Sequence, residues 1–74
     1  MSAQLPTRPH QHAEEDRGAV EHVVARLAAE FPRRHVAVVS VTVTRCRRDL
    51  AGVPSGALPE LLERLARQRL REST

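Results

Sequence analysis

One stretch decides the fold of this 74-residue chain: Leu58-Pro59-Glu60-Leu61-Leu62-Glu63-Arg64-Leu65-Ala66-Arg67-Gln68-Arg69-Leu70. Its leucines and Ala66 recur every three or four residues, so they share one face of a helix with about 3.6 residues per turn. Pro59 suits a first helical turn, and Glu60 and Glu63 each stand four residues before an arginine, a spacing that stabilises helices. The stretch predicts an amphipathic helix over 58–72, whose apolar face must pack against other elements.

Residues 14–31 predict a second amphipathic helix. Their apolar side chains recur at helical spacing, namely Val20, Val23, Val24, Leu27, Ala28 and Phe31. The first turn is acidic, which suits the positive end of the helix dipole, and Pro32 ends the helix. Residues 1–13 are rich in polar and proline residues and have almost no apolar content, so we expect a disordered leader there. Residues 73–74 form a short tail.

The middle segment, 33–51, contains two competing patterns. Over 36–44, valines alternate with serine and threonine, which is typical of a half-buried strand. A longer helical pattern steps by three and four residues through Val36, Val39, Val43, Cys46 and Leu50. Burying a valine or leucine contributes about 1.5–3 kcal/mol, more than the helix-propensity cost of up to about 0.7 kcal/mol. A lone strand would also need a second chain to satisfy its backbone. We therefore predict a helix over 33–51, with Gly52 at its C-terminal cap.

Together, the three patterns predict an all-α fold, a small three-helix bundle over 14–72 that is dimeric. A domain this small buries a modest share of its surface, and its single cysteine rules out an intrachain disulfide, so we expect oligomerisation to add stability. The predicted core comprises Val20, Val23, Val24, Leu27, Phe31, Val36, Val39, Val43, Leu50, Leu58, Leu61, Leu62, Leu65 and Leu70.

No group of residues predicts catalysis, a metal site or a cofactor site. Cys46 is the one candidate nucleophile, and neighbouring arginines favour a thiolate. It lies on the apolar pattern, however, where a free cysteine acts as a small apolar side chain. His10 and His12 give a metal little preorganisation, and His22 and His35 belong to no recognisable triad. We expect a non-enzyme without cofactor, metal or small-molecule substrate.

The main functional signal is a second apolar side on the middle helix. Val38 and Val41 fall roughly opposite the helical pattern that predicts its core face. A helix that is apolar on two sides is expected where it packs inside its own domain and also against another chain. We hypothesise that Val38 and Val41, flanked by Arg45 and Arg48, form a self-association surface, most simply that of a homodimer.

An alternative function follows from the arginines. The formal net charge is +3, and a basic footprint of this kind is typical of nucleic-acid binders. Phe31 is the only aromatic residue available for stacking, and no helix-turn-helix spacing is evident. In this alternative the chain is a small basic nucleic-acid-binding regulator with residues 36–44 as an intersubunit strand. The arginines concerned are Arg33, Arg34, Arg45, Arg47, Arg48, Arg64, Arg67, Arg69 and Arg71.

The sequence also bears on location. No apolar run approaches the roughly 18 residues of a membrane span, and the N-terminus lacks the basic-then-apolar order of a signal peptide. We expect a cytoplasmic protein without a membrane partner.

Residues 18–72 resemble a small module of actinobacterial proteins. The resemblance rests on the valine and leucine spacing from Val20 to Phe31, on the spacing from Val36 to Leu50, and most specifically on Leu-Leu-Glu-Arg-Leu-Ala-Arg-x-Arg-Leu at 61–70. That module is the three-helix bundle dimerisation domain often found N-terminal to low-molecular-weight tyrosine-phosphatase-like or arsenate-reductase-like domains. The resemblance implies an all-α fold, including a helical middle segment, and a role in self-association rather than catalysis.

Overall fold

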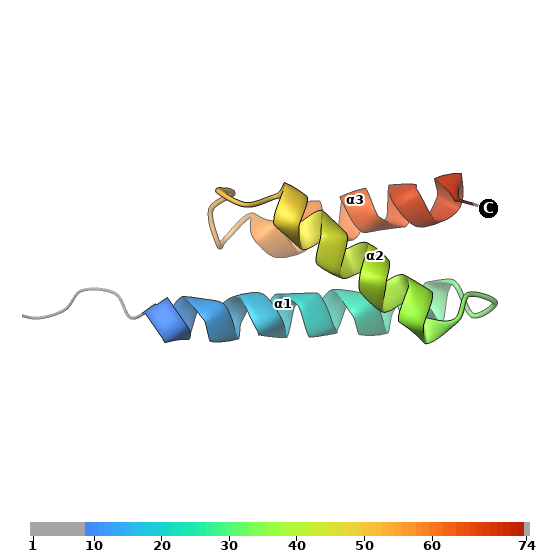
Figure 1. Ribbon diagram of the computed structural model, residues 1–74, viewed down its shortest axis with the longest axis horizontal. Coiled ribbons are helices and arrows are strands. Elements are labelled where there is room, and N and C mark those ends of the chain that lie inside the picture. The colour runs from blue at the N-terminus through green and yellow to red at the C-terminus, as the bar shows by residue number, and fades with distance from the viewer. Residues whose placement is uncertain (1–8, 74) are drawn as a thin grey trace, which may run out of the picture.

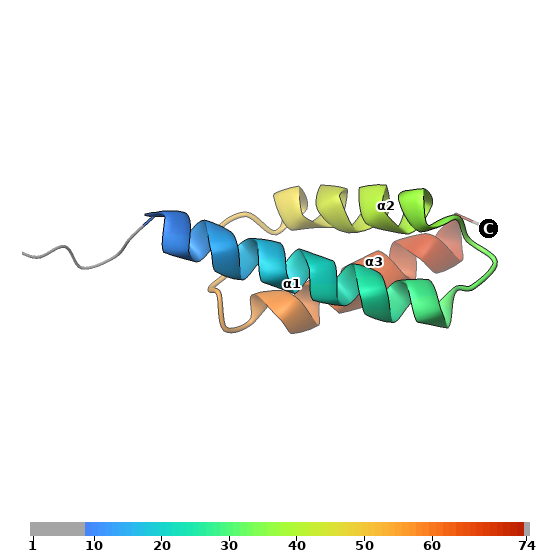
Figure 2. The same cartoon turned by 90° about the horizontal axis from the view of Figure 1, so that it is seen from below.

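The computed structural model describes the backbone of residues 9–73 and the side chains of residues 17–73. Within this range the secondary structure consists of α1 (Pro9–Glu30), α2 (Val36–Asp49) and α3 (Leu58–Glu72), with no strand. α1 and α3 run in the same direction, and α2 returns in the opposite direction across both of them (Figure 1). Each helix packs against the other two, and α2 forms one layer over the pair α1 and α3 (Figure 2). The predicted all-α three-helix bundle is confirmed.

α1 is longer than the sequence pattern indicated. It begins at Pro9, whereas the predicted helix begins at residue 14, and it ends at Glu30, one residue before the predicted end. Low apolar content was the basis for placing 9–13 in the leader, but apolar content decides whether a segment packs, not whether it extends an existing helix. A proline is well tolerated at the first helical position, and the glutamine, alanine and glutamates that follow are good helix formers. Residues 1–8 of the predicted leader and Thr74 of the tail lie outside the described residues.

α2 resolves the competition between strand and helix in favour of the helix. Its backbone is helical from Val36 to Asp49, which lies inside the predicted range of 33–51, so the intersubunit strand proposed for 36–44 is wrong. The longer apolar pattern prevailed because Val39 and Val43 are fully buried, and their burial outweighs the propensity cost of a β-branched residue. Past the end of α2, Gly52 adopts a φ of 96°, a left-handed conformation that favours glycine.

The core lies along the line where the three helices meet. Its fully buried members come from all three helices, and several of the remaining predicted core residues, such as Phe31 and Leu65, are half-buried around them. Ala66 and Cys46, which belong to the apolar patterns, are also fully buried. The buried set is Val23, Leu27, Val39, Val43, Cys46, Leu58, Leu62, Ala66 and Leu70.

Two residues predicted in the core are exposed instead. Val36 is 56% exposed because it is the first residue of α2, one turn outside Val39, where the buried side of the helix begins. Leu61 is 36% exposed. The buried residues of α3 advance by four positions, from Leu58 to Leu62 and onward, and a residue three positions after Leu58 falls to the side of that line.

Candidate interaction surface

The four residues predicted to form an interface lie on the side of α2 that faces away from the core. Val38 is 43% exposed and Val41 is 51% exposed, and Arg45 and Arg48 are exposed as well. These positions are three or four residues apart, so they share one side of the helix. The structure therefore brings the predicted residues together as one strip of surface.

Two shallow hollows run along this strip, and Val41 and Arg45 line both of them. We call the strip the outer face of α2 and define it as Ala37, Val38, Val41, Thr44, Arg45 and Arg48. The first hollow reaches the last turn of the bundle, because Ser73 at the end of α3 lines it together with Val38. The second hollow continues toward the C-terminal end of α2. The outer face is thus a continuous, gently contoured surface rather than an enclosed pocket.

Arginines on α1 and α3 are held by carboxylates at the contact between these two helices. Arg67 on α3 donates from Nε to Glu30 Oε2 at 2.8 Å and from Nη2 to Glu63 Oε2 at 2.6 Å. Arg26 on α1 pairs with Glu63 at 3.0 Å, so this group of four side chains links α1 to α3. The hydrogen bonds from Arg67 lower the pKa of Glu30 below its ordinary value. Because each carboxylate touches arginine, these charges are largely engaged within the chain.

Two further arginines tie α3 to its neighbours. Arg69 pairs with Asp49 of α2 at 2.7 Å between Nη2 and Oδ2. Arg34, in the turn between α1 and α2, donates from Nη2 to the backbone carbonyl of Leu70 at 2.9 Å, near the negative end of the α3 dipole. The basic cluster grouped by the sequence is therefore not one surface, since several members serve contacts between helices.

The outer face of α2 differs in this respect. Arg45 and Arg48 form no ion pair with any carboxylate of residues 17–73. They are accordingly available to a group outside this part of the chain. Sequence spacing could indicate the contact of Arg67 with Glu63 on the same helix. It could not separate Arg45 and Arg48 from Arg69, because the partner of Arg69, Asp49, lies on another helix.

The candidate nucleophile and the histidines do not converge on a site. Cys46 is completely buried, and burial raises the pKa of its thiol despite the opposing charge of nearby Arg69. His22 is exposed on α1, while His35 precedes α2. The side chains of His10 and His12 lie outside the described residues. Among residues whose side chains are described, no group of three potential metal ligands occurs.

His35 has a structural role that the sequence analysis missed. It is the N-cap residue of α2, and its Nδ1 accepts a hydrogen bond from the backbone N–H of Ala37 at 3.0 Å. This contact satisfies one of the free donors at the helix start. Histidine is not among the residues that usually cap helices, and the helix was predicted to begin at residue 33, so no signal placed His35 at the cap.

None of the helices, over the residues searched, is both long and apolar enough to cross a bilayer. Comparison with protein-family models, with curated proteins and with solved structures finds no match. The described residues form a small three-helix bundle in which the solvent-facing side of α2 carries Val38 and Val41.

Proposed function

We propose that this chain is a non-catalytic protein–protein interaction module that forms a homodimer through the outer face of α2. The observation that carries the proposal is the exposure of Val38 and Val41 on a helix whose opposite side is already buried. Single exposed apolar residues are common on protein surfaces. Here two valines lie one turn apart on the same side of a helix, beside two arginines that form no ion pair with residues 17–73, which is a more specific arrangement.

Helix energetics support the same proposal. A valine at an exposed helix position costs up to about 0.7 kcal/mol relative to alanine and gains little from packing in return. Burial of such a side chain against a partner contributes up to about 1.5–3 kcal/mol. Val38 and Val41 are therefore unfavourable in an isolated bundle and favourable in a dimer that covers them. A small domain with a modest core has most to gain from such burial.

The arginines of the outer face fit the border of a protein interface. Arginine is enriched in protein–protein interfaces, because its long apolar stem packs against the partner while the guanidinium remains hydrated. Arg67 and Arg69, by contrast, are engaged within the bundle, which leaves fewer free cations for phosphate contacts. This division favours a protein partner over the nucleic-acid alternative.

The resemblance of residues 18–72 to the three-helix bundle dimerisation domain of actinobacterial proteins points the same way. On this proposal the chain is a cytoplasmic dimerisation module. In such proteins the module would contribute association to the phosphatase-like or arsenate-reductase-like domain that follows it. It would contribute no reacting thiol, since Cys46 is buried in the core.

The test is molar mass by multi-angle light scattering over a wide concentration range. We expect the parent chain to approach twice the monomer mass of 8.3 kDa as concentration rises. The double variant V38E/V41E should remain monomeric, because its carboxylates oppose burial. The matched control is A25E/A29E, which adds the same charge at two exposed positions of α1.

Circular dichroism on the same samples verifies that all three chains are helical. The control should dimerise like the parent. A parent chain that stays monomeric at every concentration would overturn the proposal, and a double variant that dimerises as strongly as the control would move the interface elsewhere.

A further inference from the structure

The first turn of α2 depends on its N-terminal cap, because little packing holds it. Val36 is 56% exposed, Val38 is 43% exposed, and Ala37 between them is exposed as well. The two valines are β-branched and favour a helix less than alanine does. The first fully buried side chain of the helix is that of Val39. A loss of helical structure at this end can therefore spread through three residues without disturbing the core.

The cap itself is the imidazole of His35. Its Nδ1 accepts a hydrogen bond from the backbone N–H of Ala37 at 3.0 Å, and the backbone carbonyl of His35 accepts from the N–H of Val38 at 2.9 Å. The side chain thus satisfies a donor that has no partner within the helix. A neutral imidazole has one nitrogen that accepts and one that donates, so this contact places the ring proton on Nε2.

Protonation of the ring removes the contact. In the imidazolium form both nitrogens carry hydrogen, so neither can accept from Ala37, and the ring has to turn away from the helix end. Histidine is the side chain that ordinarily gains its proton between about pH 8 and about pH 5. The usual capping residues, namely serine, threonine, aspartate and asparagine, keep an acceptor oxygen throughout that range.

The ends of the neighbouring helices give the imidazolium no ion pair in exchange. α1 and α3 both end where α2 begins (Figure 1). The carboxylate of Glu30, at the end of α1, lies 2.8 Å from Nε of Arg67 and is engaged there. The end of α3 contributes Arg71 and Glu72, of opposite charge. His35 forms no ion pair with any carboxylate of residues 17–73.

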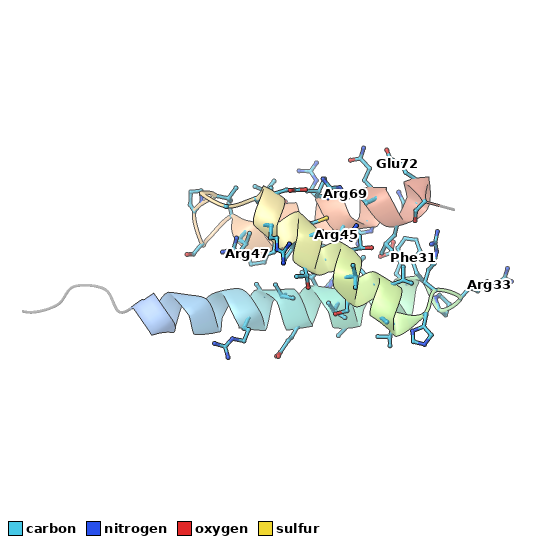
Figure 3. The ribbon with its side chains drawn as sticks, in the orientation of Figure 1. Phe31, Arg33, Arg45, Arg47, Arg69 and Glu72 are labelled. Carbon is cyan, nitrogen blue, oxygen red and sulfur yellow. The ribbon has the colours of Figure 1, made fainter. Side chains whose placement is uncertain are left out.

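The turn that precedes the cap is basic. Arg33 extends from it away from the bundle (Figure 3), and Arg34 is half-buried and donates to the carbonyl of Leu70. A proton on His35 would therefore make three consecutive residues positive. It would also place the new charge at the positive end of the α2 dipole, which is unfavourable. Both effects act in the same direction as the loss of the acceptor.

From this geometry we infer that His35 is a pH-sensitive cap, which closes the first turn of α2 when its imidazole is neutral and opens that turn when the imidazole is protonated. The stability that the cap contributes is present above the range in which histidine gains its proton and is lost as pH falls through that range. A side-chain cap changes the equilibrium constant of unfolding roughly 5-fold. The device is local, because Val39 anchors the rest of the helix.

The opened turn also bears on association, and this consequence rests on the proposed function. Val38 belongs to the outer face of α2 and lies in the first turn, whereas Val41 lies beyond Val39. Without helical geometry in that turn, Val38 no longer stays beside Val41 on one side of the helix. The dimer should therefore be weaker at the acid end of the range than at its alkaline end.

The first test compares the parent with H35N. Asparagine carries Oδ1 at the position of the histidine Nδ1, and this oxygen accepts a hydrogen bond at every pH in the range. Urea unfolding at low protein concentration should show the parent losing roughly 5-fold in stability relative to H35N between about pH 8 and about pH 5. H22N, at an exposed position of α1, is the matched control and should follow the parent. A ratio of parent to H35N that does not change with pH would overturn the inference.

The second test needs no substitution. Nitrogen NMR of the parent at the alkaline end of the range should show His35 with its proton on Nε2 and none on Nδ1. As the ring gains its second proton, the protection of the Ala37 amide against solvent exchange should fall, while that of the Leu62 amide in α3 should not. A proton found on Nδ1 of the neutral ring, or constant protection of the Ala37 amide, contradicts the cap.

Light scattering of the parent and H35N at both ends of the range tests the consequence for association. The dimer of the parent should weaken in acid more than that of H35N. A parent that is monomeric throughout would overturn the proposed dimer, while the unfolding and NMR measurements still decide the cap. A dimer that is equally strong at both ends, although the cap opens, would overturn the link between the first turn and the outer face.

Discussion

The two sides of α2 carry the same kind of residue in two different environments. Val39 and Val43 are fully buried against α1 and α3, while Val38 and Val41 are about half exposed on the outer face. Both sides carry valines, but only the buried side packs on the other two helices, and the outer face also carries Arg45 and Arg48. The core of the bundle therefore uses only the valines on the buried side of α2, and the presence of Val38 and Val41 on the outer face requires a different explanation.

The largest effect is expected from V43A on the buried side. The variant removes two buried methyl groups and leaves a cavity, so it should lower the free energy of unfolding by about 2–3 kcal/mol. Urea denaturation followed by circular dichroism measures the change. In a domain this small, a loss of that size is a large share of the total stability. A change below about 0.5 kcal/mol would show that Val43 is not packed as described.

The second-largest effect on stability is expected at the N-terminus of α2, where His35 caps the helix. H35A removes the acceptor for the Ala37 N–H and should lower stability by about 1 kcal/mol. H35D, which supplies a better capping oxygen and a negative charge at the positive end of the helix, should equal or exceed the parent. Thermal unfolding of the three proteins gives the order. If H35A and H35D are equally unstable, the imidazole contributes by packing rather than by capping.

The sequence predicted the three helices well, and it predicted their boundaries and their buried residues less well. The apolar repeats located all three helices, because regular spacing is a local property of the chain. The predicted range of the last helix, 58–72, agrees with that of α3. It misplaced Val36, because burial at the first residue of a helix depends on how far a neighbouring helix extends, and Leu61, which lies to the side of the buried line of α3. It placed Val38 and Val41 on one exposed side of α2, but whether a partner covers them is not written in the spacing.

The charged contacts were the least predictable part of the structure. The i, i+4 rule found the pair formed by Glu63 and Arg67. It could not find the contact between Arg67 and Glu30, which are 37 residues apart and meet only because α1 packs on α3. For the same reason, Arg45 and Arg48, which form no ion pair with residues 17–73, could not be distinguished from the arginines that bind carboxylates on other helices.

The third substitution, V41A on the outer face, should change the stability of the monomer in the opposite direction from V43A. V41A removes an exposed β-branched residue, so the monomer should become more stable by up to about 0.7 kcal/mol through helix propensity. The same substitution should weaken the dimer, because it removes apolar surface from the outer face. Denaturation at low concentration measures the first quantity, and light scattering at high concentration measures the second. If V41A destabilised the monomer as V43A does, the two sides of α2 would not differ in packing.

The smallest effect on stability is expected from a charged contact. Arg67 binds the carboxylate of Glu30, whereas Arg45 and Arg48 of the outer face form no ion pair with residues 17–73. The folded-state pKa of Glu30 lies below its ordinary value, so this carboxylate contributes stability above that ordinary value, and the contribution is lost as pH falls through the folded pKa. E30Q should therefore be less stable than the parent at neutral pH, and the difference should shrink in acid. E21Q, at an exposed α1 position without an ion pair to residues 17–73, is the control and should follow the parent. Thermal unfolding from neutral pH to about pH 3 measures all three. Parallel curves for E30Q and the parent would show that the contact between Glu30 and Arg67 adds nothing to the stability of the bundle.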